Sequence, residues 1–161
     1  MNMEVFEKFP SSVRKARGKG FQFAPLRMVF DVKVDLRRKA RLVIGGHVVD
    51  STGHELYAST MKSVSARVLI TIAAANNLDA MVGDIGNVYL HASTEKKVYT
   101  RAGAKFAAVG LMDEGTLLEV KKALYGIPNS GNRWHAHLSQ TLRDMGFTPT
   151  CFDPDVCIRG A

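Results

Sequence analysis

The stretch Met28-Val-Phe-Asp-Val-Lys-Val34, followed by Ala40-Arg-Leu-Val-Ile44, decides how the first third of this 161-residue chain folds. In the first segment apolar residues alternate with charged ones, which is the period of a strand with one buried face. We expect Phe30, Val32 and Val34 to lie on that buried face. A charged turn separates the two segments and the second is again strand-like, so the sequence predicts a β-hairpin with a basic tip.

Two longer segments have the spacing of amphipathic helices, with apolar side chains three and four residues apart. The first begins at Thr60 or Ser63, either of which can cap a helix, and runs to about Ala75. The second runs from about Ser130 to Met145. Shorter strands are expected at residues 79–83, 97–100 and 117–124, with a final turn and strand at 151–159.

The order of these elements indicates a fold class. Strands and helices are mixed without regular alternation, which gives an α+β domain whose mixed or antiparallel sheet packs with two main helices. We interpret residues 1–24 as an N-terminal helix and basic linker, and residues 25–161 as one domain. A domain of this length can bury a core of ordinary size.

Positive charge is concentrated near the start of the chain. Residues 14–41 contain ten Lys or Arg and two acidic residues, which gives this part a net charge of +8. The whole chain has a net charge of +7, so the remaining residues together carry −1. Such a block favours a polyanionic partner, because contacts to phosphates release counterions. The alternative is a solvated basic face that has no partner.

The cysteines and the hydropathy limit the kind of protein. Cys151 and Cys157 are the only cysteines, which indicates a reduced compartment and no disulfide framework, and no Cys/His group has the spacing of a zinc site. No apolar run reaches the roughly 18 residues that span a membrane, and the N-terminus is charged rather than signal-like. We expect an intracellular protein, cytoplasmic or nuclear, that is not secreted. The oligomeric state stays open.

Asp84 is the most informative residue of the chain. It follows the apolar stretch 79–83, and a carboxylate at the end of a buried strand requires a cation, a hydrogen-bond network or a metal. Tyr89, five residues further on, can form a wall of such a site. The alternative is that Asp84 only caps the next turn and that Tyr89 belongs to the core.

Ordered blocks of sequence resemble the reverse transcriptases of Ty1/copia-type retrotransposons, in register over nearly the whole chain from residue 25. The blocks are the hairpin Met28–His47, Gly83-Asp-Ile-Gly-Asn-Val-Tyr-Leu90, Glu95-Lys-Lys-Val-Tyr99, Lys122-Ala-Leu-Tyr-Gly126, Ser130-Gly-Asn-Arg-Trp-His135, Arg143-Asp-Met-Gly-Phe-Thr-Pro149 and Asp153-Pro-Asp-Val156. The resemblance implies the fingers and part of the palm of an RNA-directed DNA polymerase. Such an enzyme performs two-metal, template-directed nucleotidyl transfer.

The resemblance also implies roles for individual residues. Asp84 is similar to the first catalytic carboxylate, which binds Mg²⁺. The main chain at Ile85 and Gly86 would pass beside the triphosphate, and Tyr89 would stack under the nucleotide sugar. Asn129 lies in the turn before the second helix, near the nucleotide and the template.

The basic hairpin would contact the substrates. Lys39 and Arg41 match positions that grip the triphosphate, and Arg37, Arg38 and Lys33 would contact nucleic acid. The partners implied are an RNA/DNA template-primer and deoxynucleoside triphosphates, with no membrane. Lys39 and Arg41 could instead be solvent-facing strand residues.

The family's Tyr-x-Asp-Asp motif, which completes its metal site, is absent from this sequence. We therefore expect the chain to be inactive alone, and the alternatives are a non-catalytic nucleic-acid-binding module or the product of a decayed element.

Other polar side chains are weaker candidates. Asp153 and Asp155 flank Pro154, which predicts a turn rather than a second metal site. His135 and His137 are two residues apart on a helix, so they point to different faces and make a poor metal pair.

Overall fold

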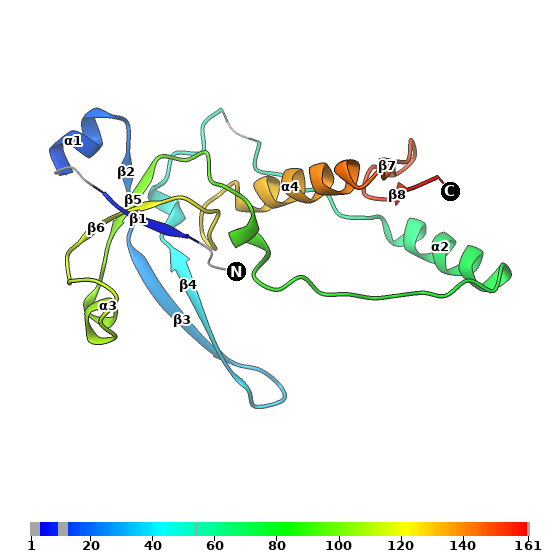
Figure 1. Cartoon of the computed structure of the whole chain (residues 1–161), viewed down its shortest axis with the longest axis horizontal. Helices are drawn as coiled ribbons and strands as arrows, with labels where there is room; N and C mark the ends of the chain where they lie inside the picture. Colours follow the sequence, from blue (N-terminus) through cyan, green and yellow to red (C-terminus); the bar gives the residue numbers. More distant parts are fainter. Residues whose placement is uncertain (1–3, 10–12, 54, 161) are drawn as a thin grey trace.

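The structure, a computed structural model, describes residues 4–9, 13–53 and 55–160. Strands and helices are mixed, as the sequence predicts (Figure 1). A four-stranded sheet in the order β1-β6-β5-β2 lies toward the left end of the molecule in Figure 1. Its strands are β1 (Phe6–Lys8), β6 (Leu117–Val120), β5 (Val98–Arg101) and β2 (Gln22–Phe23). The pair β2–β5 is parallel and the other pairs are antiparallel, so the sheet is mixed.

The predicted hairpin is present and extends away from this sheet (Figure 1). It consists of β3 (Leu26–Val32) and β4 (Arg38–Ile44), paired antiparallel from Leu26 opposite Ile44 to Val32 opposite Arg38. The expected buried face was wrong. Phe30, Val32 and Val34 are 66%, 61% and 105% exposed, although the Nζ of Lys105 lies over the Phe30 ring, 4.7 Å from its centroid.

Two main helices also lie where the sequence predicts them. They are α2 (Ser63–Ala75) and α4 (Ser130–Asp144), and the shorter helices are α1 (Val13–Gly18) and α3 (Ala104–Ala108). Two 3-10 turns, η1 (Gly46–Val48) and η2 (Val88–His91), and a small hairpin, β7 (Thr148–Pro149) with β8 (Cys157–Ile158), complete the fold. None of the described helices is long and apolar enough to cross a membrane.

Two local expectations differ from the structure. The N-terminal segment begins with a strand, β1, and its helix lies at 13–18, inside the stretch interpreted as a linker. Residues 79–83 do not form a strand, and Met81 and Val82 are 98% and 96% exposed. A strand needs a neighbour that takes its backbone hydrogen bonds, and no described segment pairs with this stretch.

The core fixes the base of the hairpin beside the loop that follows β6. Ile44 is buried with Leu124 and Ile127, and its N–H donates to the carbonyl of Tyr125 at 2.8 Å. Gly126 adopts φ +96°, and a Cβ there would lie 1.9 Å from the carbonyl oxygen of Ile44. Only glycine allows this approach. The end of β4 is therefore fixed next to Tyr125.

Candidate functional site

A cavity of about 520 Å³ brings together residues from four distant parts of the chain. We call it the Asp84 cavity. It is lined by Lys39, Ala40, Arg41 and Leu42 of β4, by residues 84–88 and Leu90 in and before η2, by Leu124 and Tyr125 after β6, and by Val5 and Phe6 at the N-terminus. Of the predicted site residues, it contains Lys39, Arg41, Asp84, Ile85 and Gly86.

The two-residue period of a β-strand determines the direction of the Lys39 and Arg41 side chains. Lys39 and Arg41 are two residues apart on β4 and therefore project to the same side of the hairpin. Arg41 forms a 3.6 Å ion pair with Asp31 on the partner strand, and Asp31 is exposed. Exposed pairs contribute little, about 0–1 kcal/mol, so this contact does not prevent Arg41 from binding an anion.

The loop that carries Asp84 is held at its far end. Asn87 adopts a left-handed conformation with φ 53°, which turns the chain into η2. The His91 Nε2–H donates to the carbonyl oxygen of Gly86 at 3.3 Å. A Cβ built on Gly86 would meet no atom within 4 Å, so the main chain is open toward a ligand at this point.

Asp84 is exposed and is the single carboxylate among the residues that line the cavity. Mg²⁺ prefers six oxygen ligands and is usually bound through one or two carboxylates together with waters and substrate phosphates. Within the described ranges, no group of three or more His, Cys, Asp or Glu could hold a metal ion. The described residues therefore do not by themselves fit a resident Mg²⁺.

Tyr89 lies outside the Asp84 cavity and lines a second cavity of about 430 Å³. We call this the Trp134 cavity, after the tryptophan of α4 that forms its wall. The ring of Tyr89 packs edge-on against that of Tyr125, with centroids 4.7 Å apart. Tyr125, like Phe6, thus lines the Asp84 cavity, and the sequence reasoning missed it. The sequence did contain an indication of its importance, because Tyr125 is the fourth residue of the family-like block Lys122–Gly126.

The remaining predicted residues do not line the Asp84 cavity. Asn129 is 2% exposed and directly precedes α4. Arg37 is paired with Asp35 at the hairpin tip, and the hydrogen bond from the Arg37 side chain lowers the pKa of Asp35 below its usual value of 3.8. Arg38 and Lys33 are exposed near the same tip. Of the five basic hairpin residues predicted for the site, two line the cavity and three lie beyond it.

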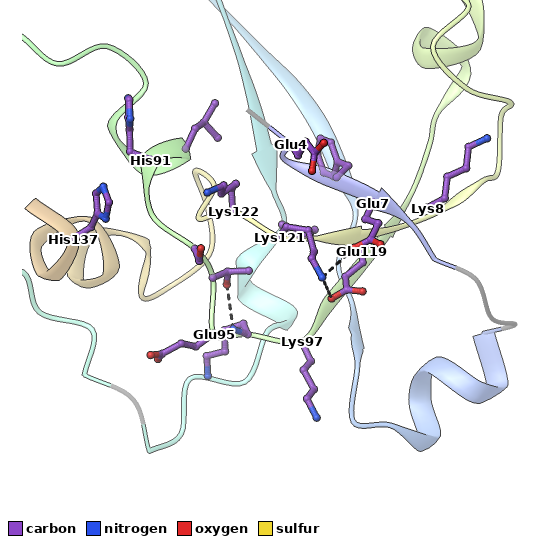
Figure 2. A pocket seen from close by; sticks show the side chains of 16 residues that line it. Glu4, Glu7, Lys8, His91, Glu95, Lys97, Glu119, Lys121, Lys122 and His137 are labelled. Carbon is purple, nitrogen blue, oxygen red and sulfur yellow. Dashed lines mark hydrogen bonds and ion pairs between the residues drawn. The ribbon is translucent and has the colours of Figure 1, made fainter. Parts of the chain in front are cut away.

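A larger cavity of about 1070 Å³ adjoins the Asp84 cavity and shares Phe6 and Leu90 with it (Figure 2). We call it the lysine cavity. Five lysines and four glutamates line it, so its charge is mixed. Lys121 bridges Glu7 and Glu119 at 3.1 Å each, and these carboxylates raise the pKa of Lys121. None of the predicted site residues lies there.

Comparison with known proteins adds independent information. A family model described as reverse transcriptase (RNA-dependent DNA polymerase) matches residues 13–161. The chain is 25% identical over 145 residues to the retrovirus-related Pol polyprotein from transposon TNT 1-94 of Nicotiana tabacum, which covers 86% of the chain and 11% of that polyprotein. No solved structure gives a significant match.

Two yeast proteins give a similar result. The transposon Ty1-BL and Ty1-DR4 Gag-Pol polyproteins of Saccharomyces cerevisiae are each 28% identical over 116 residues, or 71% of the chain. The match covers 6% and 7% of these polyproteins. The chain thus spans about a tenth or less of the length of the curated relatives it matches.

Proposed function

Because this chain belongs to the reverse transcriptase (RNA-dependent DNA polymerase) family, in its Ty1/copia-type retrotransposon branch, we propose that the Asp84 cavity receives the incoming deoxynucleoside triphosphate of DNA synthesis. In this proposal the hairpin β3–β4 is part of the fingers. The segment 84–91 and helix α4 belong to the palm, within a reverse transcriptase domain at residues 25–161. The reaction of the complete enzyme is two-metal, template-directed nucleotidyl transfer.

The observation that carries the proposal is the meeting of Lys39, Arg41 and Asp84 around one cavity. Lys39 and Arg41 provide two positive charges against one carboxylate, which suits a polyphosphate with a divalent cation. Charge-assisted hydrogen bonds from Lys and Arg to phosphate oxygens are roughly twice as strong as neutral ones. The open main chain at Gly86 leaves space for the phosphates to approach the backbone.

The sugar would lie toward Tyr125. Its ring lines the cavity and supports Tyr89 from one side, so Tyr89 would act on the sugar as part of an aromatic pair. Aromatic pairs contribute about 0.5–1.5 kcal/mol beyond their buried area. We assign Asn129 a supporting role at the start of α4, because it is buried.

Reverse transcriptases generally use divalent metal ions. Asp84 would supply one carboxylate to Mg²⁺, but one carboxylate does not complete such a site. We therefore assign no step of the reaction to the metal within this chain. The 161-residue chain is expected not to extend a primer alone, and extension that is lost in Asp84→Asn would contradict this.

A second candidate function is nucleic-acid binding without catalysis. It is favoured by the exposed position of Lys33 and Arg38 on a hairpin that extends from the body of the molecule (Figure 1). Phosphate contacts need only such cations and no metal site. In the complete enzyme the same side chains would hold the RNA/DNA template-primer.

Nucleotide binding tests the proposal. The fluorescent analogue mant-dATP, titrated with Mg²⁺ into the 161-residue chain, is expected to bind, and Lys39→Glu with Arg41→Glu should weaken binding by at least about tenfold. Lys33→Glu with Arg38→Glu is the matched control, because it reverses the same number of charges on the same hairpin outside the Asp84 cavity. Equal loss in the control, or no binding by the parent chain, would reject the proposal.

A further inference from the structure

The turn at residues 150–156 is held by its own hydrogen bonds. The N–H of Thr150 donates to the carbonyl of Val156 at 2.9 Å, and the N–H of Val156 donates to the carbonyl of Asp153 at 3.0 Å. The hydroxyl of Thr150 donates to the same Asp153 carbonyl at 2.7 Å. The main chain of the turn is thus fixed, and it presents two carboxylates, Asp153 and Asp155, to other elements.

Asp153 contacts the start of helix α2, about ninety residues earlier in the chain. Its Oδ2 accepts from the N–H of Lys62 at 3.0 Å and from the hydroxyl of Ser65 at 2.5 Å, and its Oδ1 accepts from the N–H of Asp155 at 3.2 Å. Lys62 is the N-cap residue of α2 and makes no side-chain cap of its own. Asp153 therefore caps this helix from outside.

The environment keeps this carboxylate charged. Asp153 is 1% exposed, and burial alone would raise its pKa. The hydrogen bond from Ser65, followed by that from the Lys62 amide, instead lowers the pKa of Asp153 below its ordinary value of 3.8. Ser65 is the one buried residue of α2, so the helix is anchored mainly at its first turn.

Asp155 contacts helix α4. Its Oδ1 accepts from the Nε2–H of His135 at 2.6 Å, and the hydroxyl of Ser59 lies 3.1 Å from the same Nε2. A catalytic serine–histidine–aspartate relay uses both ring nitrogens, one for each partner. Because Ser59 and Asp155 meet one nitrogen here, the arrangement joins three segments rather than activating a nucleophile.

Asp153 thus binds the start of α2 directly, and Asp155 binds His135, which lies beside Ser59 in the segment before α2. A further hydrogen bond, from Asn132 Nδ2 to the carbonyl of Tyr57 at 3.0 Å, holds the beginning of this segment. Residues 58–61 and Tyr89 line the same Trp134 cavity. The shape of this cavity therefore depends on how firmly segment 57–65 is held.

We propose that Asp153 and Asp155 form a two-carboxylate clasp that fixes segment 57–65 and the first turn of α2 beside helix α4, and so sets the part of the Trp134 cavity wall that residues 58–61 form. Both are positioning residues, since neither lies at the Asp84 cavity. The link from this wall to sugar selection rests on the proposed function. The clasp itself does not depend on it.

The clasp can be tested with an intrinsic probe. Trp134 is the single tryptophan of the chain and lines the cavity that the clasp closes. In Asp153→Asn and Asp155→Asn, acrylamide quenching of Trp134 fluorescence is expected to rise about twofold, and hydrogen exchange of peptides covering 57–69 to accelerate about tenfold. Asp144→Asn is the matched control, because Asp144 is an exposed carboxylate that accepts a hydrogen bond from Gln140 within α4.

Quenching is measured well below the unfolding temperature, with circular dichroism confirming equal helix content. A residue that contributes only to global stability would lower the unfolding temperature and leave the quenching of the folded state unchanged, which would overturn the proposal. If Asp153→Asn does not fold, Ser65→Ala replaces it, because this variant removes one hydrogen-bond donor and keeps the carboxylate. It is tested by the same measurements, the quenching of Trp134 and the hydrogen exchange of residues 57–69. If the parent chain does not bind mant-dATP, the proposed function is rejected. The quenching and hydrogen-exchange results on the clasp would still stand.

Discussion

The ring of Tyr125 packs against the ring of Tyr89, with the two planes at 63° and the centroids 4.7 Å apart. Tyr125 faces the Asp84 cavity and Tyr89 faces the Trp134 cavity, so this contact joins the two. The backbone of Tyr125 is held by the N–H of Ile44 on β4. The position of Tyr89 therefore depends on the base of the basic hairpin.

We predict that Tyr125→Ala reduces the preference of the chain for mant-dATP over mant-ATP by about threefold to tenfold, because Tyr89 loses the ring that supports it. The measurement is the ratio of the two dissociation constants. Tyr125→Phe is the control and should keep the parent ratio, since the ring contact does not need the hydroxyl. Equal ratios in all three proteins would show that the pair has no part in sugar selection.

Asp153 predicts a specific dependence of stability on pH. Its pKa is lower in the folded chain than its ordinary value of 3.8, so its stabilising contribution is present above that value and is lost as the pH falls through the folded pKa. The unfolding temperature of the parent should exceed that of Asp153→Asn by a constant amount down to about pH 5, and the difference should shrink below about pH 4. A difference that grows on acidification would contradict the assignment.

The basic hairpin predicts salt-dependent binding of nucleic acid without sequence preference. If about five of its basic side chains reach phosphates, log K should fall with log salt at a slope of roughly −4 on duplex DNA. Reversal of Arg37, Arg38, Lys39 and Arg41 to Glu should flatten this slope in fluorescence anisotropy.

The matched control reverses Lys8, Lys96, Lys97 and Lys122, all from the lysine cavity, and should keep the slope. Binding that does not depend on salt, or an equal effect of the control, would favour the reading of the hairpin as a solvated face.

The close approach of Gly126 to the Ile44 carbonyl predicts that the base of the hairpin does not tolerate a side chain at position 126. In Gly126→Ala the new Cβ would lie 1.9 Å from the Ile44 carbonyl oxygen on a backbone with φ +96°, so we expect a loss of about 3 kcal/mol or failure to fold. Gly103→Ala is the control, because a Cβ there meets nothing within 4 Å. Thermal unfolding of both variants is the measurement, and equal stabilities would contradict the close approach.

Local patterns predicted part of the local structure. The presence of the hairpin and the bounds of α2 and α4 follow from alternation and helical spacing, which depend on neighbouring residues only. The strand expected at 79–83 did not form, because pairing needs a second segment that sequence periodicity does not reveal. The exposure of Phe30 has the same origin, since alternation shows which face is apolar but not what covers it.

The site was predictable only in part. Sequence blocks named Lys39, Arg41 and Asp84, and the fold brings them to one cavity. Tyr125 was missed because its role depends on a contact with Tyr89, 36 positions earlier. The link from Asp153 to the first turn of α2 crosses about ninety residues, and the sequence showed only a turn around Pro154.

The central claim is that the triphosphate binds in the Asp84 cavity, and photo-crosslinking tests it most directly. The 161-residue chain, irradiated with 8-azido-dATP and Mg²⁺ and digested for mass spectrometry, is expected to carry label on peptides containing 39–42, 84–88 or Tyr125. Excess unlabelled dATP should remove this label. Label concentrated instead on Lys96, Lys121 or Lys122 would place the nucleotide in the lysine cavity and contradict the account.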